Sequence, residues 1–175
     1  MEKFDVYDDN RIPLNKSLIR GQEKCGVNEN RLVVHICVFN SKNEMLIQQR
    51  QPHKYPYPSL WDVSAGGSCM TGETSKEGAR RELMEELGID YDFTHQRAHL
   101  TVNFDHGFND FYLIECDINA DDVHMQEEEV QGVKLASEQE ILEAIDNGTF
   151  IPYHKPLIST LFAMKDNRGC QKRNF

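Results

Sequence analysis

The chain has 175 residues, of which 39% are hydrophobic and 27% charged, a balance that suits one folded domain and excludes disorder, collagen and coiled coil. It has no apolar run of the ~20 residues that cross a bilayer and no apolar signal peptide at its start, so we expect a cytoplasmic protein without a membrane partner. Its 19 basic and 29 acidic residues give a net charge of −10, which disfavours nucleic acid as a partner and calls for divalent cations if a phosphorylated metabolite is to bind.

The first half of the chain is expected to consist mainly of strands and turns. Apolar or β-branched runs predict strands at 4–7, 31–39, 45–49 and 61–65. A weakly patterned stretch separates the first two and ends near Asn30. The turn at 40–43 joins a hairpin, and the three prolines of 51–60 indicate a loop.

The second half contains the best-defined helix of the chain, at 74–88. Thr74 and Glu77 form a capping box at its start, and Gly88 closes its end. Further strands are predicted at 97–104, 110–117 and 130–136, and further helices at 138–147 and from about 156 onward. The polar tail after Asp166 is expected to be frayed. Strands interleaved with a few helices predict an α/β or α+β domain with a mixed sheet.

Three glutamates of the 74–88 helix share one side of it. Glu82, Glu85 and Glu86 fall within an arc of about 100°, beside the apolar stripe that packs on the core. Their mutual repulsion raises their pKa values unless a cation lies among them, and a cluster of oxygen ligands suits Mg²⁺ or Mn²⁺ better than zinc. The alternative is a solvated acidic face that is stabilised by a pair such as Arg81 with Glu85.

Residues 67–89 resemble the Nudix box at every position that the pattern defines. Those positions are Gly67, Glu73, Arg81, Glu82, Leu83, Glu85, Glu86, Gly88 and Ile89. A pattern of this length is far more specific than a short glycine motif. The flanks are also similar to the family, with a hairpin at 31–49, Trp61 before the glycines and a later acidic segment.

The resemblance implies an α/β/α sandwich around a mixed β-sheet. It divides the chain into an N-terminal strand and extension (1–30), a Nudix hydrolase domain (31–165, with the box at 67–89) and a polar C-terminal tail (166–175). It further implies hydrolysis of a diphosphate linkage in a small molecule, typically a nucleoside diphosphate joined to another group X. The protein is then expected to be a pyrophosphohydrolase that needs Mg²⁺ or Mn²⁺.

The resemblance also assigns roles within the box. The glutamates that match Glu82, Glu85 and Glu86 hold the metal ions, and the backbone carbonyl at Gly66 assists them. The arginine that matches Arg81 orients the carboxylates, partly through the glutamate that matches Glu73. The metal ions neutralise the diphosphate and polarise a water, from which a carboxylate removes the proton.

Glu82 is the candidate for that general base inside the box. The later cluster of glutamates at 127–129, with Glu128 at its centre, lies where many family members supply another base or metal ligand, and a solvated loop is the alternative. Arg50 and Lys54 follow the 31–49 hairpin and are candidates to bind phosphate oxygens, again with a solvated loop as the alternative.

Residues 4–73 are similar to a subgroup related to isopentenyl diphosphate isomerase. Gly66 stands where the isomerase has its catalytic cysteine, and Ser68 and Arg31 replace two of its metal-binding histidines. A hydrolase therefore ranks first and an isomerase-like enzyme second. A catalytically silent nucleotide-binding module ranks third, because such modules usually lose box carboxylates. The sequence does not define the oligomeric state, although proteins that resemble this chain are often homodimers.

Overall fold

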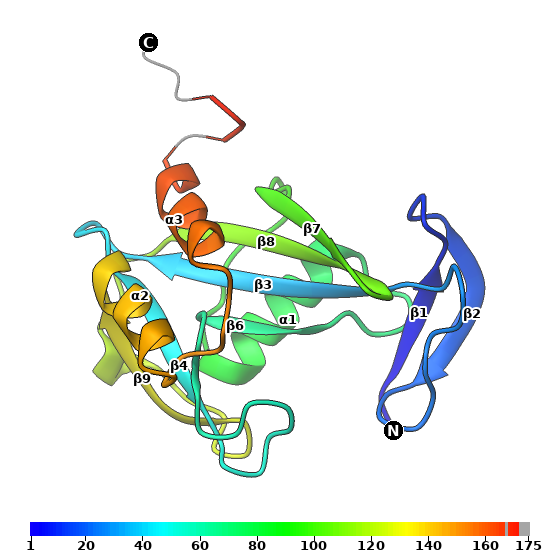
Figure 1. Cartoon of the computed structure of the whole chain (residues 1–175), viewed down its shortest axis with the longest axis horizontal. Helices are drawn as coiled ribbons and strands as arrows, with labels where there is room; N and C mark the ends of the chain where they lie inside the picture. The colour runs from blue at the N-terminus through cyan, green and yellow to red at the C-terminus, as the bar shows by residue number, and fades with distance from the viewer. Residues whose placement is uncertain (167, 172–175) are drawn as a thin grey trace.

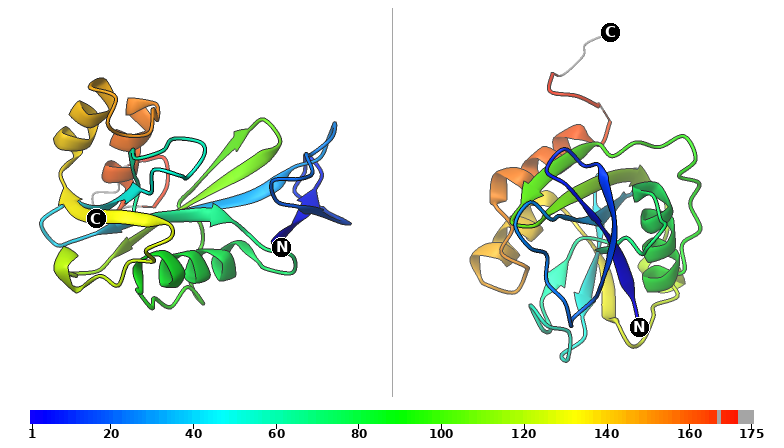
Figure 2. Two further views of the ribbon diagram at one scale, coloured as in Figure 1. Left: turned by 90° about the horizontal axis from the view of Figure 1, so that it is seen from below. Right: turned by 90° about the vertical axis from the view of Figure 1, so that its right-hand side faces the viewer.

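A seven-stranded mixed sheet lies between α1 on one face and α2 and α3 on the other (Figure 1, Figure 2). The computed structural model describes residues 1–166 and 168–171. The strands of this sheet are β3 (Arg31–Phe39), β4 (Met45–Arg50), β5 (Trp61–Asp62), β6 (Ala65–Ser68), β7 (Leu100–Phe104), β8 (Gly107–Glu115) and β9 (Val130–Ala136). The predicted α/β/α sandwich around a mixed sheet is confirmed.

The helices are α1 (Ser75–Leu87), α2 (Glu138–Asp146) and α3 (Lys155–Met164), with a short 3₁₀ turn at Ala120–Asp122. The predicted caps of α1 are present: the Thr74 N–H donates to Glu77 at 2.8 Å, and Gly88 adopts φ +67 at the end. None of the helices in the described residues is long and apolar enough to cross a membrane. The tail predicted after Asp166 lies partly outside the described residues, at 167 and 172–175.

The strand β3 runs through the centre of the sheet. It is parallel to β8 and antiparallel to β4 and β6, which share one of its edges. Successive side chains of a strand point to opposite faces. Leu32, Val34 and Ile36 therefore join the core under α1, whereas Cys37 and Phe39 join the core under α2 and α3.

The strands β4 and β6 diverge along this shared edge. β4 pairs with β3 only at Val38 and Phe39, and β6 pairs with β3 from Val33 to Ile36. β4 continues beside β5 and β9 instead. Side chains of β4 and of α1 meet between the diverging strands, because Gln48 donates a hydrogen bond to Glu86 at 2.8 Å.

The N-terminal residues form a separate two-stranded sheet of β1 (Lys3–Tyr7) and β2 (Pro13–Ile19). The weakly patterned stretch up to Asn30 contains a strand, β2, for which the sequence analysis made no prediction. The first five residues of β2 are exposed, so the strand shows no alternation of apolar and polar residues. Figure 2 shows this hairpin at one end of the sandwich.

Two strand boundaries also differ from the predictions. Only Asp105 and His106 separate β7 from β8, because Phe104 pairs with Gly107 across a tight two-residue turn. His106 accommodates the turn with φ +65. The extended segment predicted at 61–65 is divided between β5 and β6.

Candidate active site

Two residues of β6 turn their backbone polar groups toward α1. Along an antiparallel pair, alternate residues bond to the partner strand and the others point both groups away from it. Gly66 and Ser68 are the residues that point away. The Gly66 N–H donates to Glu86 at 3.0 Å, and the Ser68 carbonyl accepts from Arg81 at 3.1 Å. By the same rule the carbonyl of Gly66 faces away from β3, on the side of the carboxylates.

Arg81 connects the acidic residues of the site. Its guanidinium has five N–H donors, and each of them makes a hydrogen bond. Two go to Glu73 at 2.7 and 2.9 Å, one to Glu82 at 2.9 Å, one to Glu85 at 3.0 Å and one to the Ser68 carbonyl. Burial opposes the charge of Arg81, but the bonds to Glu73 and Glu82 outweigh it and raise the pKa of the guanidinium.

Glu82 and Glu86 form a pair of buried carboxylates, 7% and 6% exposed. Burial, and then the charge of Glu82, raises the pKa of Glu86 to about 8, against the hydrogen bonds from Gln48 and Gly66. Burial also raises the pKa of Glu82, with the charge of Arg81 opposing the rise. Two buried carboxyl groups cannot both ionise at low cost. A cation between them would therefore stabilise their charged forms.

Gly67 allows the backbone of β6 to lie directly against this pair. A Cβ atom at Gly67 would lie 2.2 Å from Oε1 of Glu82, so any larger residue would displace the carboxylate. Two carboxylates beside a backbone carbonyl form an oxygen donor set of the kind that Mg²⁺ and Mn²⁺ prefer. The residues present therefore fit a divalent cation.

Glu85 does not join the buried pair. It is 48% exposed and bound to Arg81. In the described part of the chain, no group of three or more His, Cys, Asp or Glu side chains converges closely enough to hold a metal ion. The structure thus brings Glu82 and Glu86 together and leaves Glu85 outside this pair, bound to Arg81.

The two predicted phosphate ligands lie at the end of β4 and in the loop that follows it. Arg50 is 17% exposed, so it is not part of a solvated loop, and its Nε has no partner among the described residues. Lys54 is ion-paired with Glu129. Burial lowers the pKa of the Lys54 ammonium, and the charges of Glu86 and Glu82 act on it in the opposite direction.

The glutamates of 127–129 lie next to the 51–60 loop, but their contacts differ. The Gln51 side chain donates to the Glu127 carbonyl at 2.7 Å, which joins the two loops. Glu129 binds Lys54, whereas Glu128 is exposed and makes no hydrogen bond or ion pair within residues 1–166 and 168–171. In this conformation Glu129, and not the predicted Glu128, forms the ion pair with Lys54.

Two contributors were missed from the sequence. Gln48 is 3% exposed and holds Glu86; a polar residue at a buried position of an apolar strand is the signal that identifies it. Arg20 precedes the matched pattern entirely, yet its charge opposes the rise in the pKa of Glu82 that burial causes. Arg20-Gly21 is among the features shared with the isomerase-related subgroup, but the sequence gives Arg20 no role at the carboxylates, because that role depends on tertiary structure.

Comparison with known proteins gives a consistent result. Residues 29–158 match the NUDIX domain family. The uncharacterized Nudix hydrolase lmo0368 of Listeria monocytogenes is 40% identical over 166 residues, which cover 95% of this chain and 96% of that protein. The solved structure of DR0079 from Deinococcus radiodurans has a TM-score of 0.76 at 22% identity and covers 91% of this chain and 99% of that one. An isopentenyl-diphosphate Delta-isomerase of Serratia proteamaculans is 30% identical over 111 residues, 58% of this chain and 62% of that protein.

Replacing Gly67 with alanine should weaken the binding of Mn²⁺ about 10- to 100-fold, because the new Cβ displaces the Glu82 carboxylate. Calorimetric titration with Mn²⁺ measures the affinity, and circular dichroism checks the fold. Gly132→Ala is the matched control, since a Cβ at Gly132 meets nothing within 4 Å. Equal affinities in the two variants would show that the Gly67 backbone does not support the site.

The metal-free protein should lose stability as the pH rises from about 4.5 to about 8. Glu86 has a pKa of about 8 when folded and an ordinary value of 4.5, so the folded state binds more protons in this interval and stability falls with pH. Glu86→Gln should remove this loss, which is on the order of 4 kcal/mol between pH 5 and pH 8. Urea unfolding in EDTA at pH 5 and pH 8 measures it; parallel pH dependences in the two proteins would contradict the assignment.

Proposed function

The chain belongs to the Nudix hydrolase family, and from that premise we propose that it hydrolyses a diphosphate linkage in a small molecule of the nucleoside diphosphate–X type. The observation that carries the proposal is the buried pair of Glu82 and Glu86. Both lie against the glycine strand β6; Arg81 holds Glu82, whereas Gln48 and the Gly66 N–H hold Glu86. A structural role alone does not account for two buried carboxylates with raised pKa values.

Nudix hydrolases generally use divalent cations, and we propose Mg²⁺ or Mn²⁺ here. Glu82, Glu86 and the Gly66 carbonyl would hold the ions, and Glu85 would join them by turning away from Arg81. Such ions supply charge neutralisation for the diphosphate and make a bound water more acidic. The proposed donors are all oxygens, which favours these cations over zinc.

The other side chains position the reacting groups. Arg81 fixes the carboxylate of Glu82 and is itself fixed by Glu73 through two hydrogen bonds. Glu82, in its buried position, is our candidate to accept the proton of the attacking water. Arg50 has one donor, its Nε, without a partner among the described residues, and we propose that it binds phosphate oxygens together with Lys54.

Two other activities rank lower. An isomerase-like enzyme needs a proton donor at Gly66, where the chain has no side chain. A silent binding module would not need a complete set of box carboxylates. The domain limits of 31–165, with an extension at 1–30 and a tail at 166–175, remain a prediction, as do a homodimer and the absence of a nucleic acid partner.

Glu85→Gln and Glu86→Gln should each lower metal-dependent turnover at least about 100-fold while the fold persists, because each removes a ligand charge. The assay measures phosphate products from a panel of diphosphate metabolites with Mg²⁺, with Mn²⁺ and with EDTA. Isopentenyl diphosphate belongs in the panel and is assayed for its isomer as well. Glu143→Gln, an exposed change on α2 at the opposite face of the sheet, is the control. Unchanged turnover in both box variants would refute the metal assignment.

Glu128 can be tested against its neighbour Glu127, since both are exposed. If Glu128 is the general base, Glu128→Gln should lower kcat about 100-fold or more, and Glu127→Gln should leave it within about twofold. Single-turnover kinetics separate the chemical step from product release. Wild-type kcat in both variants would assign the 127–129 loop to a solvated role and leave Glu82 as the base.

A further inference from the structure

The loop between β6 and α1 carries Glu73 on a tight turn. The Glu73 N–H donates to the Met70 carbonyl at 3.0 Å, and Gly72, at the third position of the turn, adopts φ +84. The Glu73 carboxylate accepts the Met70 N–H at 2.7 Å and two hydrogen bonds from Arg81. The position of Arg81, and through it that of Glu82, therefore depends on how firmly this turn is held.

The N-terminal hairpin of β1 and β2 holds the two central residues of the turn. The Thr71 N–H donates to the Lys3 carbonyl at 2.9 Å, and the Gly72 N–H donates to the Asp5 carboxylate at 2.8 Å. Both turn residues are exposed, so water could satisfy these N–H groups if the hairpin did not. The hairpin thus takes the place of water at the box, although it precedes the family match, which begins at residue 29.

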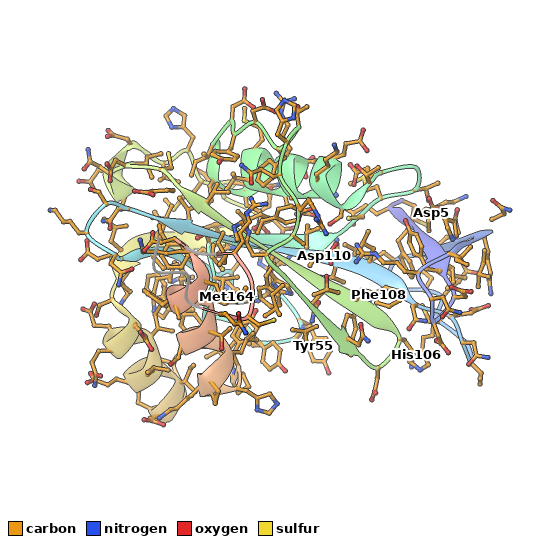
Figure 3. All side chains as sticks on the ribbon, turned by 90° about the horizontal axis from the view of Figure 1, so that it is seen from above. Asp5, Tyr55, His106, Phe108, Asp110 and Met164 are labelled. Carbon is orange, nitrogen blue, oxygen red and sulfur yellow. The ribbon has the colours of Figure 1, made fainter. Side chains whose placement is uncertain are left out.

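A buried carboxylate attaches the same hairpin to the start of α1. Asp110, on β8, is 1% exposed and forms a two-bond ion pair with Arg11, in the turn between β1 and β2. It also accepts hydrogen bonds from Ser75, the first residue of α1, at 2.5 Å and from Thr101, on β7, at 2.6 Å. Figure 3 shows Asp110 on the ribbon of β8 and Asp5 on the neighbouring hairpin. One side chain thus joins the hairpin to two strands and to the helix that carries the glutamates.

Glu73 lies between these two attachments. The residue before it, Gly72, is bound by Asp5. Two residues after it, Ser75 is bound by Asp110, which the hairpin also binds through its ion pair. The hairpin therefore fixes the backbone on either side of the carboxylate that holds the guanidinium of the box. Groups that are already fixed in the fold need not be ordered when a metal ion binds.

We propose that the N-terminal hairpin, residues 1–28, raises the affinity of the site for its metal ions by holding the turn that carries Glu73. Asp5 acts on the turn directly, and Asp110 acts through Ser75 and the ion pair with Arg11. Both are positioning residues, because they act through the turn. The inference rests on the proposed function for the metal ions, and it gives a segment outside the matched domain a role in the chemistry of that domain.

The first test compares Asp5→Ala with Glu29→Ala in the binding of Mn²⁺, measured by calorimetric titration. Both carboxylates are half-buried, and each accepts one backbone N–H: Asp5 accepts that of Gly72 at 2.8 Å, and Glu29 accepts that of Gly26, outside the box, at 2.9 Å. Asp5→Ala should weaken Mn²⁺ binding about tenfold, because it releases an outer support of the metal site, whereas Glu29→Ala should change it by no more than about twofold.

Asp5→Asn separates the hydrogen bond from the charge, because it keeps an oxygen for the Gly72 N–H. It should restore most of the Mn²⁺ affinity that Asp5→Ala loses. Equal affinities in Asp5→Ala and Glu29→Ala would overturn the proposal. An equal loss in Asp5→Ala and Asp5→Asn would also overturn it, because the effect would then belong to the negative charge and not to the held turn.

The second test asks whether Asp5 acts through Glu73. In the Glu73→Ala background the turn no longer holds Arg81, so Asp5→Ala should there change Mn²⁺ affinity by less than about twofold. Urea unfolding of each variant ensures that the titrations are made on folded protein. A loss as large in this background as in the wild type would show that Asp5 affects the site by another route, and the proposal would fail.

Amide hydrogen exchange in the metal-free protein tests the anchor. Arg11→Gln should accelerate exchange of the Thr71 and Gly72 amides about tenfold or more, and Lys16→Gln, which breaks an ion pair of the hairpin with Glu29, should leave them within about twofold. If Arg11→Gln does not fold, the double variant with Asp110→Asn leaves no unpaired buried charge and gives the same comparison. Unchanged exchange of the two amides would remove the ion pair from the proposal.

These outcomes are distinct from failure of the proposed function. A protein that cleaves nothing in the panel, yet loses Mn²⁺ affinity on Asp5→Ala and recovers it on Asp5→Asn, keeps the role of the hairpin and loses the hydrolase. A protein that cleaves a diphosphate with the same dependence on Mg²⁺ concentration in the wild type and in Asp5→Ala keeps the hydrolase and loses the role of the hairpin.

Discussion

The five hydrogen bonds of the Arg81 guanidinium are the constraint on which the site depends. They draw Glu73, Glu82 and Glu85 together with the carbonyl of Ser68, so that a helix side with several negative charges can pack against the sheet. A lysine has three donors and no planar fork, and it could not serve all of these acceptors. Because the guanidinium has no donor left for Glu86, that carboxylate is left to Gln48 and the Gly66 amide.

The sheet contributes through a local departure from regular pairing. Where β4 leaves β3, β6 takes its place, and the opening between β4 and β6 admits the long side chains of α1. A sheet with β4 paired along its full length would have no room for Glu86 between strands. Gly66 and Gly67 belong to the same arrangement, because the absence of side chains lets the carboxylates approach the backbone. The divergence of β4 from β6 and the glycines of β6 thus both serve to accommodate the carboxylates of α1.

The sequence predicted correctly those features that depend on residues close together in the chain. The caps and apolar stripe of α1 were readable because Thr74, Glu77 and Gly88 act within one turn of the helix. β2 was missed because its exposed residues carry no alternation, and the sequence placed Glu85 with its neighbours because helical spacing cannot show that Arg81 holds its side chain outward. The roles of Gln48, Arg20 and Asp110 depend on segments that meet only in the folded chain. Their chemistry therefore becomes visible with the tertiary structure.

The Arg11–Asp110 pair also bears on where the cooperative folding unit begins. A fragment starting at residue 29 would retain the whole matched domain, yet it would keep a carboxylate that is 1% exposed without its counter-charge. Ser75 and Thr101 would still donate to Asp110, but they carry no charge to balance it. The border of the matched NUDIX domain thus differs from the border that charge balance favours for the folding unit, and the hairpin lies inside the second although it lies outside the first.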